Sequence, residues 1–212
     1  MSIEPIRATH ATRAQRRWRA LIATIACAII ALGSQGQALA QSPEACKAEK
    51  VGTQKMVDFP TAFAAAEKRV RAWQPDAAVV RLTQTALGPI DTEARSANWY
   101  MVWFSPATKK RIAITIANGV MTCYQDTDNP GRVPILKSGV YTDVKQILAT
   151  ASDRGGAALL QKGALPTVEM SAGSEVSGYR GLWYVNYRVK DGPSLMVMFD
   201  GSTGKFEKAI PN

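Results

Sequence analysis

Two similar stretches decide the expected fold: WYMVW at residues 99–103 and WYVNY at residues 183–187. Each stretch leads through a short turn into a second apolar strand and then a glycine, and a segment with helical spacing precedes each. The chain is therefore expected to repeat one small unit. We predict an α+β protein of two tandem units, each with one helix packed on an antiparallel sheet of three to four strands.

Capping residues set the expected helix ends. Asp58, followed by a proline in the first turn, predicts a helix start, and the QPD sequence at 74–76 predicts its end. Asp143 and Gly155-Gly156 mark the second helix in the same way. Strands are expected at 78–85, 99–104, 111–116 and 120–124 in the first unit (58–124), and at 165–171, 182–189, 194–200 and 204–209 in the second (143–212). The turn-rich residues 125–142 are predicted to connect the two units.

Alternation along the repeated strands assigns their faces. The core-facing set is predicted to be Trp99, Met101, Trp103, Trp183, Val185 and Tyr187. The opposite face is then apolar for a solvent-facing surface, and its candidate partner-binding residues are Tyr100, Val102, Phe104, Tyr184, Met196 and Met198. The plainer interpretation is that the two units themselves, or the N-terminal tail, cover this face, and a partner or ligand surface is the other.

The N-terminus has the pattern of a secretory signal peptide over residues 1–40. A cluster of arginines precedes an apolar run at 21–32, and the Ala38-Leu39-Ala40 sequence predicts cleavage between Ala40 and Gln41. The apolar run is shorter than the ~20 residues that span a bilayer, so no stable span is expected after leader removal. We predict a periplasmic or secreted protein.

Charge and cysteine content agree with an exported protein. The net charge of +9 falls to +5 without the predicted leader, and the basic residues are scattered, which argues against nucleic-acid binding. Two cysteines remain, Cys46 in the predicted tail (41–57) and Cys123 beside a predicted strand. In an oxidising compartment we expect them to form a disulfide, with two unpaired thiols as the alternative.

The sequence shows no catalytic constellation. His10, the one histidine, lies in the predicted leader, which excludes histidine-based triads and metal sites from the mature chain. The DTDNPG sequence at 126–131 begins like a calcium loop, but Pro130 and Lys137 occupy ligand positions, so a turn is expected. Ser202 and Lys205 match S-x-x-K without its companion motifs, so a hydrolase that uses them is the least favoured hypothesis. No cofactor or metal is expected.

The W-x-V-x-Y stretch at 183–187 and the VMFDGSTGKF sequence at 197–206 resemble the closing strands of a PepSY repeat. In this reading Asp200 and Thr203 hydrogen-bond the turn backbone while Gly204 adopts a positive φ. The resemblance covers about 143–209 and reaches about 58–122 only through the internal repeat. PepSY modules occur in metallopeptidase propeptides and in exported envelope proteins, so the resemblance implies binding or regulation rather than catalysis.

Together these features predict an exported, non-enzymatic binding or regulatory protein of the cell envelope. Its expected partner is an envelope protein or peptide, with a peptidase as one class. The alternative is a periplasmic small-molecule or lipid-binding protein that uses Tyr184, Met196 and Met198.

Overall fold

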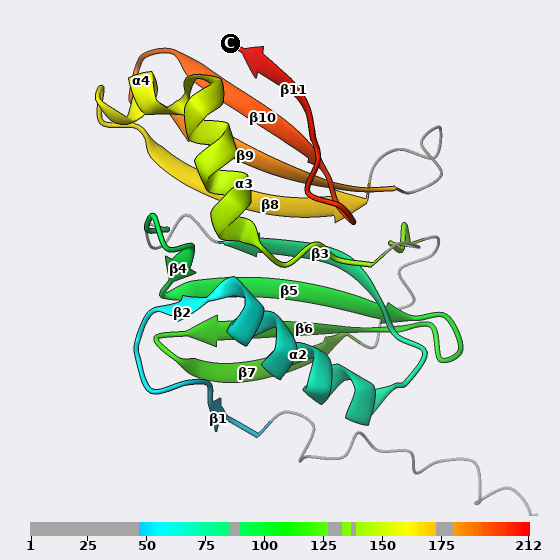
Figure 1. The fold of residues 1–212 in the computed structure, drawn as a ribbon. Coiled ribbons are helices and arrows are strands. Elements are labelled where there is room, and N and C mark those ends of the chain that lie inside the picture. The colour runs from blue at the N-terminus through cyan, green and yellow to red at the C-terminus, as the bar shows by residue number, and fades with distance from the viewer. Residues whose placement is uncertain (1–46, 85–89, 127–132, 137–138, 173–179) are drawn as a thin grey trace, which may run out of the picture. The chain divides into compact units, whose positions relative to one another are not determined.

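The computed structural model describes residues 47–84, 90–126, 133–136, 139–172 and 180–212, and residues 43–212 belong to one compact unit. Its strands are β1 (Glu49–Lys50), β2 (Val57–Asp58), β3 (Ala78–Gln84), β4 (Arg95–Ser96), β5 (Asn98–Ser105), β6 (Lys110–Ala117), β7 (Val120–Asp126), β8 (Leu165–Ala172), β9 (Gly181–Arg188), β10 (Ser194–Asp200) and β11 (Phe206–Pro211). Nine of them form one antiparallel sheet in the order β1-β7-β6-β5-β3-β8-β9-β10-β11 (Figure 1). β2 and β4 pair separately.

The predicted fold class, two tandem units each with its own small sheet, is wrong. Strands β3 and β8 pair through Arg81↔Ser171, Leu82↔Met170 and Thr83↔Glu169, so the strands of both predicted units belong to one sheet. The physical reason is that an edge strand leaves backbone hydrogen-bonding groups unpaired. In separate units β3 and β8 would each leave a row of backbone N–H and C=O groups unpaired, and here the two rows satisfy each other.

A single core continues across the β3–β8 junction. The buried apolar residues of both predicted units form one cluster. Phe59 lies at its centre, with its ring 5.2 Å from that of Trp99 on β5 and 5.1 Å from that of Trp183 on β9. The two repeated strands therefore contribute to the same core.

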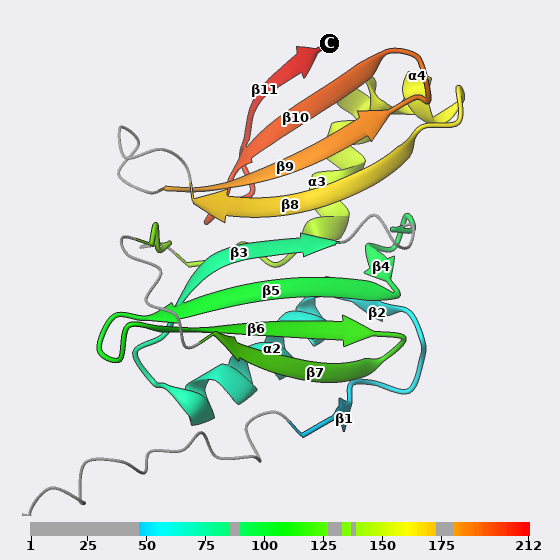
Figure 2. The ribbon, with the colours of Figure 1, turned by 180° about the vertical axis from the view of Figure 1, so that it is seen from behind.

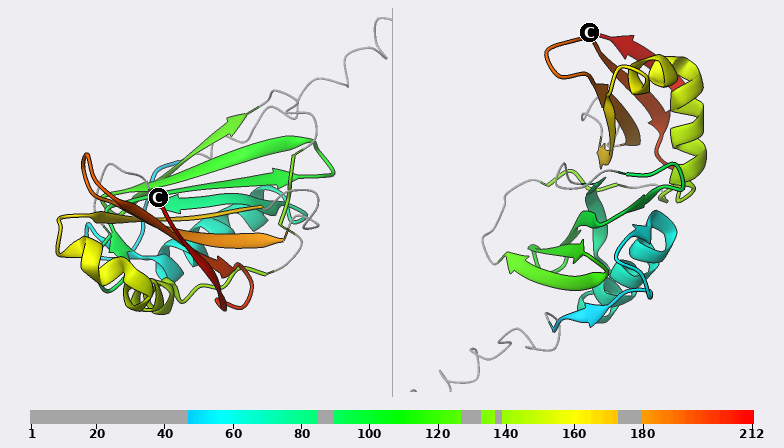
Figure 3. Two further views of the ribbon diagram at one scale, coloured as in Figure 1. Left: turned by 90° about the horizontal axis from the view of Figure 1, so that it is seen from above. Right: turned by 90° about the vertical axis from the view of Figure 1, so that its left-hand side faces the viewer.

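The helices cover one face of the nine-stranded sheet. Helix α2 (Phe59–Trp73) and helix α3 (Val144–Ala151) both lie in front of the sheet in Figure 1 and behind it in Figure 2, and the edge-on view of Figure 3 agrees. Both predicted N-caps are confirmed. The Asp58 carboxylate accepts from the Thr61 N–H at 2.9 Å, and the Asp143 carboxylate accepts from the Gln146 N–H at 3.0 Å.

The predicted break of the second helix at Gly155-Gly156 is confirmed. Helix α3 is followed by η2 (Ser152–Gly156), within which Arg154 and Gly155 leave helical geometry, and a separate short helix, α4 (Ala157–Leu160), follows this kink. Gly155 has a φ of +117°, which turns the chain. A Cβ on Gly156 would lie 2.4 Å from Cζ of Tyr187, so the glycine permits close packing of this segment on β9.

The predicted core face of the repeated strands is confirmed. Trp99, Met101, Trp103, Trp183, Val185 and Tyr187 are all buried. Burial raises the pKa of the Tyr187 phenol to about 12, because the charged form would lose its hydration.

One short strand, β1, lies within the predicted N-terminal tail, and a second, β2, begins at its last residue. β1 pairs with the edge of β7, and β2 lies beside Trp99, whose indole N–H donates to the Val57 carbonyl at 2.8 Å. A tail without structure was expected because two-residue strands leave no periodic pattern in the sequence. The tail thus pairs with the first two residues of the edge strand β7.

Candidate binding face

The predicted partner-binding residues alternate with buried core residues along β5, β9 and β10, which places them on the face of the sheet that carries no described helix. Figure 2 shows the sheet from this side. Tyr100, Val102, Tyr184 and Met196 are partly exposed. The other two are buried: Phe104 exposes 6% and Met198 exposes 8% of its surface. Alternation alone places all six on this face, but burial leaves four of them available to a partner. We call Tyr100, Val102, Tyr184 and Met196 the candidate face.

Strand pairing joins the two tyrosines into one row across the sheet. Tyr100 pairs with Thr83, Thr83 with Glu169, and Glu169 with Tyr184. Because neighbouring strands are ~4.8 Å apart, the two tyrosine backbones lie about 14 Å apart. The row crosses the β3–β8 junction. It therefore depends on the pairing of these two strands, which the sequence repeat did not predict.

Polar groups separate the two tyrosines. The Arg81 Nε and a Glu169 carboxylate oxygen form an ion pair of 2.9 Å, and both side chains are partly exposed. Solvent screens such a pair, so its contribution to stability is small. The Arg81–Glu169 pair instead places charged groups that can form hydrogen bonds between the two tyrosines.

Tyr184 remains a neutral phenol at ordinary pH. Burial raises its pKa most, and the carboxylates of Glu169 and Glu207 raise it further, while a hydrogen bond with Ser171 lowers it. A neutral, partly buried phenol offers an apolar ring and a hydrogen-bonding hydroxyl on the same surface. This combination suits contact with another protein chain.

Further apolar side chains lie on the helix-free side. Tyr124 and Val120 on β7 expose 70% and 37%, while Met121, between them along the strand, is buried in the core. Leu165 on β8 exposes 65%, and its odd spacing from the buried Val168 places the two side chains on opposite faces of the strand. Strand alternation predicts the face on which Val120 and Tyr124 lie. It does not predict their exposure, because exposure depends on which neighbours cover the strand.

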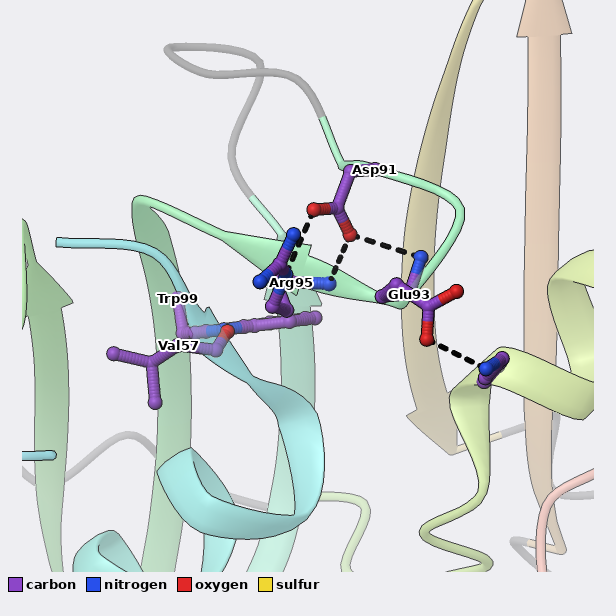
Figure 4. A network of polar contacts seen from close by, with 6 residues as sticks. Val57, Asp91, Glu93, Arg95 and Trp99 are labelled. Carbon is purple, nitrogen blue, oxygen red and sulfur yellow. Dashed lines mark hydrogen bonds and ion pairs between the residues drawn. The ribbon is translucent and has the colours of Figure 1, made fainter. Parts of the chain in front are cut away.

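The polar network in Figure 4 fixes the loop before β4. Asp91 accepts from the Arg95 N–H at 2.8 Å and pairs with the Arg95 Nε at 2.9 Å, and Glu93 pairs with Lys145 of α3 at 2.5 Å. Asp76 instead accepts from Ser105 Oγ at 2.8 Å, at a different hairpin. The carboxylates of Asp76 and Glu93 thus form separate hydrogen bonds and ion pairs that hold different loops, and they do not form an acid–base pair.

The hydrogen bond from the Ala107 N–H contributes most to lowering the pKa of Asp76 below its ordinary value.

Within the described ranges, no three or more His, Cys, Asp or Glu residues gather in a geometry suited to a metal ion.

The predicted hydrogen bonds of the PepSY-like turn are confirmed. Asp200 accepts from the Thr203 N–H at 2.9 Å, Thr203 Oγ1 accepts from the Lys205 N–H at 3.3 Å, and Gly204 has a φ of +69°. Ser202 Oγ donates to Asp200 at 2.8 Å, which ties it into the turn. Partial burial would raise the pKa of Asp200, but the hydrogen bonds from Ser202 and Thr203 together outweigh it and lower the pKa. The turn residues serve to close the β10–β11 hairpin.

Several predictions fall on residues outside the described ranges. Cys46 is one of them, so its disulfide with Cys123 on β7 stays a prediction. The same holds for the predicted signal peptide (1–40) and for most of the calcium-like turn (126–131).

No family model matches the chain, and no curated protein matches its sequence. The structure is similar to the crystal structure of a "putative lipoprotein" from Clostridium difficile 630, with a TM-score of 0.47 and 11% identity, over 76% of this chain and 96% of that one. In the described part of this chain, no helix combines the length and the apolarity that crossing a bilayer requires.

Proposed function

We propose that this chain is an exported, non-enzymatic protein of the cell envelope that binds a protein or peptide on its candidate face. The observation that carries the proposal is one-sided coverage of the sheet. The helices lie on one face, and the other presents Tyr100, Val102, Tyr184 and Met196 partly exposed. Apolar and aromatic groups grouped on an open sheet face favour contact with a partner.

The shape of the candidate face favours a polypeptide over a compact ligand. Tyr100 and Tyr184 are separated by about 14 Å, which four residues of extended chain span at ~3.3 Å per residue. Thr83 and Glu169 lie between them and supply hydrogen-bonding groups. Met196 beside the row adds a side chain that adapts to irregular surfaces. Aromatic and apolar side chains with polar groups between them are typical of protein–protein interfaces.

The sequence supports the location and the first partner class to test. The leader pattern at 1–40 predicts export, and the PepSY-like residues at 183–206 suggest an envelope peptidase as that class. Because no family model matches, this suggestion rests on the quoted residues alone.

The test is crosslinking and affinity capture of the exported protein in its own envelope, comparing Val102→Lys with the unmodified chain. Val102 is partly exposed, so the new charge lies on the candidate face. Ala72→Lys, which adds the same charge at an exposed position of α2, is the matched control. Thermal unfolding confirms that both variants fold.

The captured protein is expected to be lost with Val102→Lys and retained with Ala72→Lys. Capture of the same protein by both variants would overturn the proposal. So would native mass spectrometry showing a small molecule that Val102→Lys displaces, because the carrier alternative would then hold.

A further inference from the structure

One end of the sheet gathers exposed apolar and basic side chains on neighbouring turns. Leu160 at the end of α4 exposes 40%, and Leu165 at the start of β8 exposes 65%. They are two of the four exposed large apolar residues among those the structure describes. Figures 1 and 2 show α4, the start of β8 and the β9–β10 turn at this same end.

Backbone contacts hold the two leucines outward. The Gly163 N–H donates to the Leu160 carbonyl at 2.9 Å, and the Ala164 N–H donates to the Leu159 carbonyl at 3.0 Å. Leu159 and Ala164 are buried, exposing 8% and 3%. Each buried residue directly precedes an exposed leucine, so the turn is anchored from inside while both leucines point away from the core.

Basic residues lie on the same turns and strand starts as the leucines. Lys162 lies in the turn between them, Arg188 pairs with Leu165 across the β8–β9 ladder, and Lys190 follows in the β9–β10 turn. All three are exposed, and none forms an ion pair with another described residue. One carboxylate, Asp191, lies in the β9–β10 turn, so the cluster keeps an excess of positive charge.

We propose that this cluster, Leu160, Lys162, Leu165, Arg188 and Lys190, is a membrane-docking tip that binds a lipid surface carrying anionic headgroups. The leucines enter the boundary between headgroups and acyl chains, and the cations contact lipid phosphates. A small apolar tip with a basic rim matches the chemistry of such a surface.

A lipid surface fits the tip better than a folded acidic protein does. Specific protein interfaces bury at least about 1,000 Å² in total, and two leucines on a turn supply a small part of that area. A bilayer needs no matching shape, because lipids rearrange around an inserted side chain. The tip and the candidate face are built from different residues, so this inference goes beyond the proposed partner binding.

Co-sedimentation with vesicles tests the tip, using protein purified after export and checked by mass spectrometry. The vesicles contain phosphatidylglycerol with phosphatidylcholine, or phosphatidylcholine alone. Leu165→Asn is expected to lower the partition coefficient on anionic vesicles about tenfold, from the burial of one leucine side chain. Tyr124→Asn is the matched control, since Tyr124 is 70% exposed on β7, and it should leave partitioning unchanged.

The basic rim has its own variants. Replacing Lys162, Arg188 or Lys190 by Gln is expected to weaken binding about fivefold each, and raising the salt concentration should weaken it further. Lys68→Gln, on the exposed side of α2, is the control without effect. Equal binding by Leu165→Asn and the unmodified protein would overturn the proposal.

Absence of binding, binding that does not need phosphatidylglycerol, or competition by polyglutamate without vesicle binding would overturn it too. The Val102→Lys variant should still bind vesicles, so failure of the tip and failure of the proposed partner binding are distinguishable.

Discussion

Phe59→Ala tests whether the two halves of the chain share one core. Phe59 is fully buried, and its ring contacts Trp99 at 5.2 Å and Trp183 at 5.1 Å between centroids, both edge-on. Truncating a buried phenylalanine costs about 3–5 kcal/mol of unfolding free energy. Each aromatic pair contributes about 0.5–1.5 kcal/mol of this beyond the buried area. We expect the loss to destabilise strands on both sides of the β3–β8 junction.

The assay combines urea unfolding with amide hydrogen exchange read by mass spectrometry. A double-mutant cycle of Phe59→Leu and Trp183→Leu isolates the aromatic contact across the junction, with an expected coupling of about 1 kcal/mol. In Phe59→Ala, protection should fall together in β5 and β9. If protection fell in β5 alone and the coupling were zero, the shared core would be refuted and the halves would unfold independently.

Three further predictions concern local contacts. Gly156→Ala should lower the unfolding free energy by at least about 1 kcal/mol in thermal melts, since its Cβ would meet Tyr187 at 2.4 Å, and a gain in stability would contradict this packing. The Tyr187 pKa of about 12 exceeds the usual tyrosine value of ~10, so the unfolded state loses the proton first and the unfolding free energy should fall by about 2–3 kcal/mol between pH 10 and 12. Urea unfolding of Tyr187→Phe over the same pH range should show a smaller fall, and an equal dependence of the unfolding free energy on pH in both proteins would argue against burial as the cause. If Cys46 and Cys123 are bonded, reduction should add the mass of two hydrogen atoms and remove up to about 4.5 kcal/mol of stability, whereas an unchanged mass would exclude the bond.

Local structure was predictable from the sequence because its causes are local. Asp58 and Asp143 cap helices through hydrogen bonds to residues three positions away. Alternation within a strand fixes which side chains share a face, which is why Trp99 and Trp183 were correctly placed in the core. The hairpin turn at Asp200 was predictable for the same reason.

The architecture was not predictable from the same patterns. Alternation along β3 and β8 says which side chains face the core, but it does not say which strand lies at the open edge. The pairing of Thr83 with Glu169 therefore left no signal, and the repeat favoured two separate sheets. Burial of Phe104 on the helix-free side also depends on packing between distant segments. The break of the second helix was predictable from a local cause, the positive φ of Gly155, whereas the short helix α4 that follows it was not predicted.

The candidate site was predictable in part. Strand alternation identified Tyr100, Val102, Tyr184 and Met196, which remain partly exposed. The proposed docking tip was not predictable, because the exposure of Leu165 depends on which neighbouring segments cover it, and strand alternation does not specify them.

Site-specific photocrosslinking in the native envelope tests the central claim, that the helix-free face contacts a partner, most directly. A photoreactive residue is placed at Tyr100 or Tyr184 on that face, or at the exposed Ala72 of α2 as the reference. We predict that Tyr100 and Tyr184 yield the same crosslinked polypeptide and that Ala72 yields none. A polypeptide captured from Ala72 alone, or no adduct from either tyrosine position, would contradict the account.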